Sequence, residues 1–100
     1  MVKHIILWKL KEELTAQEKE NAKQSIKTNL EGLVGKIEGL EKMEIRIDKL
    51  ESSSADLMMD SEFTSEAALK AYQINPYHVD VAENIVRPNV SVRLSMDFEL

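Results

Sequence analysis

Hydrophobic and polar residues alternate along four segments of the chain, Val2–Trp8, Leu40–Lys49, Ala55–Phe63 and Val90–Phe98. A period of two residues is typical of β-strands that bury one face, so each segment is predicted to be a strand. On the first strand, one face carries the residues Val2, His4, Ile6 and Trp8. On the last strand, the apolar set from Val90 to Phe98 is expected to face the core, which would turn Arg93 away from it.

Between these strands the apolar residues recur every three to four positions, which is the period of a helix with one buried face. A long helix is predicted from about Thr15 to Gly35, on the stripe Ala22, Ile26, Leu30, Leu33 and Ile37. Thr15 and Glu18 have the spacing of a capping box at its start. Gly35 and Gly39 mark its end, because glycine tolerates the left-handed conformation that closes helices.

Two short helices are predicted between the third and fourth strands. The first opens at Ser65 and Glu66. The second begins at Asn75-Pro76, because asparagine is a good N-cap and proline fits the first helical turn. The segment Arg87–Asn89 ends it.

The resulting order, β-α-β-β-α-β, predicts an α+β fold of the ferredoxin-like type, with antiparallel strand order 4-1-3-2 and helices on one face. Residues 1–100 are expected to form one domain. Strands 1 and 3 are then central, and they carry the apolar residues Ile5, Leu7 and Met58 on the face that the helices leave open. A second copy of the chain is the expected cover, since burying apolar surface is worth roughly 25 cal/mol per Å². Arg46 and Arg93 are expected at the rim of that interface.

The composition of the chain limits the classes of function that it can have. Thirteen basic and eighteen acidic residues leave a net charge of −5, which disfavours nucleic acid or anionic lipid as a partner. There is no cysteine, so thiolate chemistry and cysteine-based zinc sites are excluded. No apolar run has the roughly 20 residues of a membrane span, and no signal-like segment is visible, so a cytoplasmic location is expected.

Several short motifs of the chain resemble one known family, the stress-responsive A/B barrel (Dabb) domains. They are the opening strand Val2–Lys11, Phe63-Thr64-Ser65, the segment Ala71–His78 and the closing Met96–Glu99, and their order covers essentially the whole chain. The resemblance implies ferredoxin-like monomers that pair sheet to sheet into a dimeric α+β barrel. It does not imply one function, because the family holds stress-associated proteins, members without an assigned activity and a polyketide cyclase.

Within that family, the segment Ala71–His78 resembles members of the olivetolic acid cyclase type. The resemblance assigns the catalytic tyrosine and histidine to Tyr72 and His78, and the pocket histidine of the first strand to His4. The family often has His-Pro-x-His in this motif, whereas this chain has Asn75-Pro76-Tyr77-His78.

The residues themselves allow the same chemistry. His78 is the third residue of the helix that begins after Asn75, and the positive end of a helix favours a neutral imidazole, which can accept a proton. Tyr72 can donate a hydrogen bond to a carbonyl on which enolate charge develops. The alternative is structural: Tyr72 as a core residue, His78 as a hydrogen-bonded residue of a helix start, and His4 as a satisfied core histidine. His4 and His78 lack metal-ligand spacing, and no phosphate-binding glycine loop is present, so no metal or cofactor is expected.

The sequence is compatible with three functions. The first is a dimeric protein of unassigned activity that binds a small hydrophobic or carbonyl-containing ligand between sheet and helices. The second is a cofactor-independent, polyketide-cyclase-like enzyme with His78 as base and Tyr72 as donor. The third, by fold analogy alone, is a cofactor-free monooxygenase. Whether His4, Tyr72 and His78 converge on one cavity is the observation that bears most on this choice.

Overall fold

The computed structural model describes residues 1–100. Their elements, in chain order, are β1 (Val2–Leu10), α1 (Ala16–Glu31), β2 (Leu40–Arg46), β3 (Leu57–Phe63), α2 (Glu66–Ile74), α3 (Pro76–Val81) and β4 (Val90–Glu99). A π-helical segment, Ala82–Val86, and a short 3-10 turn, Arg87–Asn89, join α3 to β4. Every predicted strand and helix is present.

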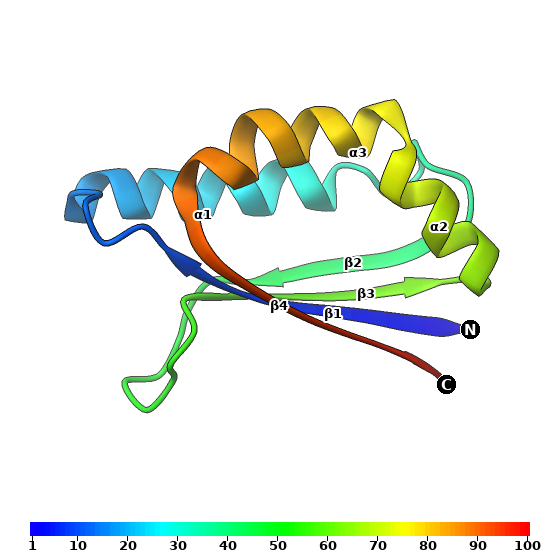
Figure 1. Ribbon diagram of the computed structural model, residues 1–100, viewed down its shortest axis with the longest axis horizontal. Coiled ribbons are helices and arrows are strands. Elements are labelled where there is room, and N and C mark those ends of the chain that lie inside the picture. Colours follow the sequence, from blue (N-terminus) through cyan, green and yellow to red (C-terminus); the bar gives the residue numbers. More distant parts are fainter.

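The four strands form one antiparallel sheet in the order β2-β3-β1-β4, which is the predicted order read from the other edge. All helices lie on one face of this sheet, with α1 and α3 side by side above it (Figure 1). This is the predicted α+β, ferredoxin-like arrangement. No helix is both long enough and apolar enough to cross a membrane.

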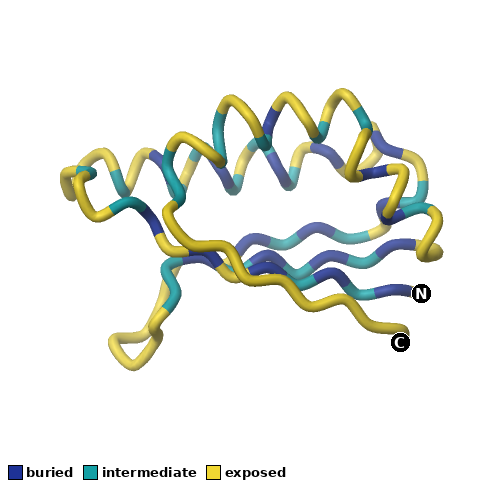
Figure 2. The backbone as a smooth tube through the Cα atoms, viewed as in Figure 1, coloured by how far each residue is buried: buried dark blue, intermediate teal, exposed yellow.

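The core lies between the helices and the face of the sheet turned toward them, here called the inner face. Buried positions alternate along β1 and β3, as the period of two predicts (Figure 2). The inner face of β1 buries Val2, His4, Ile6, Trp8 and Leu10. The stripe of α1 packs against this face through Ala22, Ile26 and Leu30, which are buried as expected.

The start of α1 is as predicted, but its end is not. Thr15 accepts a hydrogen bond from the Glu18 backbone N–H, and the Glu18 carboxylate accepts one from the Thr15 N–H, so the capping box is complete. The helix ends at Glu31, four residues before the predicted Gly35. The next turns are tight, with Leu33 N–H donating to the Leu30 carbonyl. Leu33 and Ile37 are buried in these turns. Their apolar side chains therefore extend the helical spacing in the sequence although they lie outside the helix.

The faces of β4 are opposite to the prediction. The antiparallel register pairs Arg93 with Trp8 and Asp97 with His4, both on the inner face of β1. Arg93 and Asp97 therefore lie on the inner face as well. Leu94, Met96 and Phe98 lie on the outer face, the face without helices, and are exposed there. The expectation that Arg93 faces away from the helices was wrong, because the apolar side of this edge strand is not its core side.

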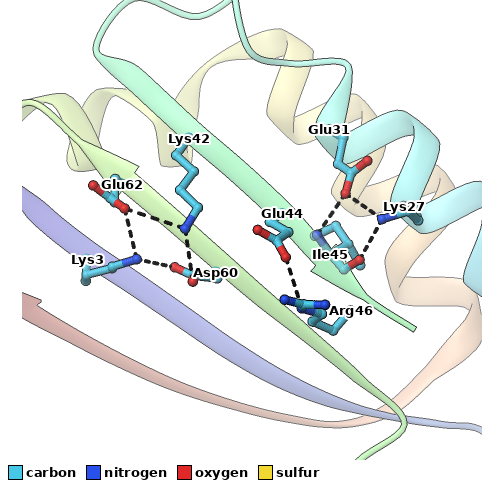
Figure 3. A network of polar contacts seen from close by, with 9 residues as sticks. All are labelled: Lys3, Lys27, Glu31, Lys42, Glu44, Ile45, Arg46, Asp60 and Glu62. Carbon is cyan, nitrogen blue, oxygen red and sulfur yellow. Dashed lines mark hydrogen bonds and ion pairs between the residues drawn. The ribbon is translucent and has the colours of Figure 1, made fainter. Parts of the chain in front are cut away.

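The outer face divides into a charged half and an apolar half. On β1, β2 and β3, Lys3 and Lys42 form ion pairs with Asp60 and Glu62, at N–O distances of 2.5 to 3.7 Å (Figure 3). Next to them, toward β4, lies a set of apolar side chains that we call the outer patch: Ile5, Leu7, Met58, Leu94, Met96 and Phe98. The predicted apolar surface is thus present and is larger than the three residues expected.

Candidate functional site

A cavity of about 530 Å³ opens between the inner face of β1 and β4 and the helices above them. Its lining includes His4, Tyr72 and His78, so the three predicted site residues line the same cavity. Apolar side chains, among them Ile6, Trp8 and Met59, make up most of the rest. A small, largely apolar cavity with a few converging polar groups is the usual form of a small-molecule site.

Tyr72 enters this cavity from the last turns of α2. Its side chain is buried, and its ring lies 4.9 Å from the ring of Phe63 and 4.1 Å from that of His78, measured between centroids. The Tyr72 hydroxyl has no hydrogen-bond partner in the protein. Because no fully buried side-chain polar atom of the chain lacks a partner, this hydroxyl is not fully buried and opens onto the cavity that Tyr72 lines. Burial raises the pKa of the phenol above its usual value of 10.0. The hydroxyl therefore stays protonated and can donate a hydrogen bond.

His78 lies on α3, which starts after the Asn75 cap and the Pro76 first residue as predicted. Its Nδ1 is 3.3 Å from the Gln73 carbonyl oxygen. Because a carbonyl only accepts, this nitrogen carries the hydrogen, and Nε2 of the neutral ring has the free lone pair. Burial lowers the pKa of His78 below 6.5; the Gln73 carbonyl raises it, and the charges of His4 and Arg93 lower it. Burial is therefore the main cause of the neutral state expected for His78, which the sequence attributed to the helix start.

His4 lies on the inner face of β1 and is almost fully buried. Its Nδ1 is hydrogen-bonded to the carboxylate of Asp97, which stands opposite it on β4. The carboxylate accepts a hydrogen bond from Nδ1–H, which orients the ring with Nε2 directed away from Asp97. No protein group bonds Nε2, which therefore also opens onto the cavity.

Sequence reasoning missed three polar residues at this site: Asp97, Gln73 and Arg93. Asp97 orients His4, the Gln73 carbonyl orients His78, and Arg93 lines the cavity. The signal for Asp97 and Arg93 was available in principle, since pairing β4 antiparallel to β1 places them opposite His4 and Trp8. No group of three His, Asp or Glu side chains is arranged to hold a metal ion.

The arrangement supplies the two groups that an acid–base step on a carbonyl compound needs. A protonated phenol can donate to a carbonyl oxygen, and a neutral imidazole beside it can accept a proton. The two rings are inclined by only 34° at a centroid distance of 4.1 Å, so one bound molecule can contact both.

Known structures share this fold. A dimeric protein of unknown function and ferredoxin-like fold from Bacteroides fragilis is similar with a TM-score of 0.91 and 30% identity, over 99% of this chain and 95% of that one. A dimeric ferredoxin-like protein from Thermobifida fusca has a TM-score of 0.82 and 23% identity, over 99% and 90%. A hydroxynitrile lyase from Passiflora edulis has a TM-score of 0.79 at 14% identity, over 99% and 92%.

At 14% identity the likeness to the lyase shows a common fold and no more. No curated protein sequence matches the chain. The model of the stress responsive A/B barrel domain family matches residues 2–100, and the B. fragilis structure is similar over nearly the whole chain. The chain therefore belongs to the stress-responsive A/B barrel domain family.

Proposed function

We propose that this protein binds a small carbonyl compound in the cavity between the sheet and the helices. The observation that carries the proposal is the Tyr72 hydroxyl, which is protonated, faces the cavity and has no partner in the protein. A carbonyl oxygen is an acceptor that matches this donor, and the apolar lining suits the hydrocarbon part of such a ligand.

Binding can be tested by NMR titration with 4-oxo-4-phenylbutanamide, a neutral aryl ketone. Backbone amide shifts are expected at β1, α2 and α3, around the cavity. Tyr72→Phe should weaken binding about 2- to 10-fold, the effect of one hydrogen bond. Tyr77→Phe removes a hydroxyl from an exposed neighbour of His78 and should leave the affinity unchanged. Equal affinities of Tyr72→Phe and the unchanged protein, or shifts confined to the outer face, would contradict the proposal.

A second function, cofactor-independent proton transfer, is favoured by His78. Its Nε2 lone pair is free, and its ring lies against that of the proposed carbonyl donor. In this reaction the C–H bond next to the carbonyl breaks and its proton moves to Nε2. Its electron pair forms the C=C bond of the enolate, and the C=O π pair moves to the oxygen, to which Tyr72 donates a hydrogen bond. A polyketide-cyclase-like condensation would begin with this step.

Exchange of the C3 protons of 4-oxo-4-phenylbutanamide with D₂O, followed by ¹H NMR, measures this step without assuming a product. His78→Gln should slow protein-catalysed exchange by about 10²-fold, the usual scale for a general base. Tyr77→Phe again serves as the control. Equal exchange rates with and without His78 would remove it from the mechanism and leave binding as the function.

The same proposal includes a homodimer formed through the outer patch. The B. fragilis and T. fusca proteins are described as dimeric. In the single chain, Leu94 and Met96 of the outer patch are 63% and 67% exposed. Contiguous exposed apolar side chains typically mark contacts between proteins when they form a large patch.

A further inference from the structure

We infer that the ligand of the cavity is an anion, namely a carbonyl compound that also carries a carboxylate, and that Arg93 binds this carboxylate. The inference rests on the proposed function, since it defines the class of carbonyl compound. It concerns a residue that plays no part in the binding of the carbonyl by Tyr72.

The charge of the cavity differs from that of the chain. The chain carries a net charge of −5. The fifteen residues that line the cavity include no Asp or Glu, but they include the two arginines Arg87 and Arg93. Arginines without neighbouring acids in the lining favour an anion locally, even in a protein with a negative net charge.

Arg93 is the cation that is free to bind an anion. The chain has three arginines. Arg46 is paired with Glu44 at 2.9 Å and Arg87 with Glu83 at 2.7 Å, whereas Arg93 has no ion pair. The planar guanidinium can hold both oxygens of a carboxylate by parallel hydrogen bonds, which makes this ligand a better match than a single-point acceptor.

The acidic residues on the inner face of β4 lie toward the other end of the strand from Arg93 and are not in the lining of the cavity. Asp97 and Glu99 line a neighbouring pocket together with Glu66 of α2. Asp97 is also engaged by His4. Charge therefore changes sign along this face of β4, from positive at Arg93 to negative at Asp97 and Glu99. This polarity favours a ligand whose carboxylate lies at the Arg93 end.

Arg93 also acts electrostatically on the two groups proposed to contact the carbonyl. Its charge lowers the pKa of both Tyr72 and His78, although burial has the larger effect on each. One molecule bound across this space would thus meet a cation for its carboxylate and a phenol and an imidazole for its carbonyl. A cavity of about 530 Å³ has room for a small ligand with both groups.

The test compares 4-oxo-4-phenylbutanoate with the neutral 4-oxo-4-phenylbutanamide, which has nearly the same shape, by NMR titration of the whole protein. The carboxylate should bind at least about 10-fold more tightly, the scale of a charge-assisted hydrogen bond, and this preference should shrink as salt is added. Arg93→Gln should bring the two affinities together, mainly by weakening the binding of the carboxylate. Arg46→Gln, on the outer face, should keep the full preference.

The outcomes separate the two proposals. Equal binding of both compounds by the unchanged protein would overturn the anion proposal and leave carbonyl binding in place. An undiminished preference in Arg93→Gln, or its loss in Arg46→Gln, would overturn the assignment to Arg93. If neither compound shifts the cavity residues, both the anion proposal and the proposed function are wrong.

Discussion

The protonation state of His78 decides whether this residue can act as the proposed base. Burial lowers its pKa below 6.5, the Gln73 carbonyl raises it, and the charges of His4 and Arg93 lower it further. We therefore expect a ¹H–¹³C NMR titration of the ring to give a pKa below 6.5, and Arg93→Gln to move that value upward. A pKa above 6.5 would contradict the buried, poorly solvated imidazole that the structure shows.

The same shift predicts a pH dependence of stability. Because the folded state holds His78 neutral, the unfolded chain binds its proton more readily, and the free energy of unfolding should fall as the pH drops below about 6.5. This loss should level off once the pH is below the folded-state pKa. Chemical denaturation between pH 7.5 and 5 should show a smaller loss for His78→Gln. Parallel curves for the two proteins would contradict the buried, neutral imidazole.

Only those site residues that belong to local sequence motifs or to a central strand could be predicted from the sequence. Tyr72 and His78 lie six positions apart in one segment, and His4 lies in a strand that had to be central, so their convergence on one cavity could be anticipated. Asp97 and Arg93 could not be placed in the same way. Their position depends on which face of an edge strand turns inward, which only the register with β1 decides.

At the scale of elements, the connection between α1 and β2 depends on two glycines with positive φ, Gly35 at 90° and Gly39 at 86°. A Cβ at Gly39 would lie 2.6 Å from the Ala68 Cβ of α2, whereas a Cβ at Gly35 would meet nothing within 4 Å. Both alanine variants strain the backbone, but only Gly39→Ala also pushes α2 away from the loop. Gly39→Ala should therefore lower the midpoint of thermal unfolding more than Gly35→Ala. Equal losses would mean that the loop and α2 are not in close contact.

The order of the helices and strands was predicted correctly from the sequence, but some of their boundaries were not. The capping box at Thr15 and the Asn75-Pro76 start are local hydrogen-bonding patterns, and both were predicted correctly. The end of α1 was placed four residues late, because Leu33 and Ile37 are buried from non-helical turns. The orientation of β4 was wrong because alternation shows that a strand has an apolar face without showing what covers that face.

For the whole molecule, the proposed second copy would explain why the apolar face of β4 points away from the helices. Leu94, Met96 and Phe98 continue the apolar surface that Ile5 and Leu7 begin on β1. Two such faces related by a two-fold axis would remove them all from water, for a gain of roughly 25 cal/mol per Å².

Leu94→Asp tests this dimer without disturbing the core, since Leu94 is exposed in the single chain. Sedimentation equilibrium at micromolar concentration should give twice the chain mass of 11.4 kDa for the unchanged protein and values near 11.4 kDa for Leu94→Asp. Val34→Asp makes the same change at an exposed position in the turns after α1, and should remain dimeric. A monomeric unchanged protein would show that the outer patch does not pair.

The most direct test of the account is a crystal structure of the protein with 4-oxo-4-phenylbutanamide bound. We predict the ketone oxygen about 2.6–3.2 Å from the Tyr72 hydroxyl, within hydrogen-bond distance, and the neighbouring CH₂ group facing Nε2 of His78. A ketone bound on the outer face, in the pocket beside Glu66 and Asp97, or in the cavity without contact to Tyr72 would contradict the account.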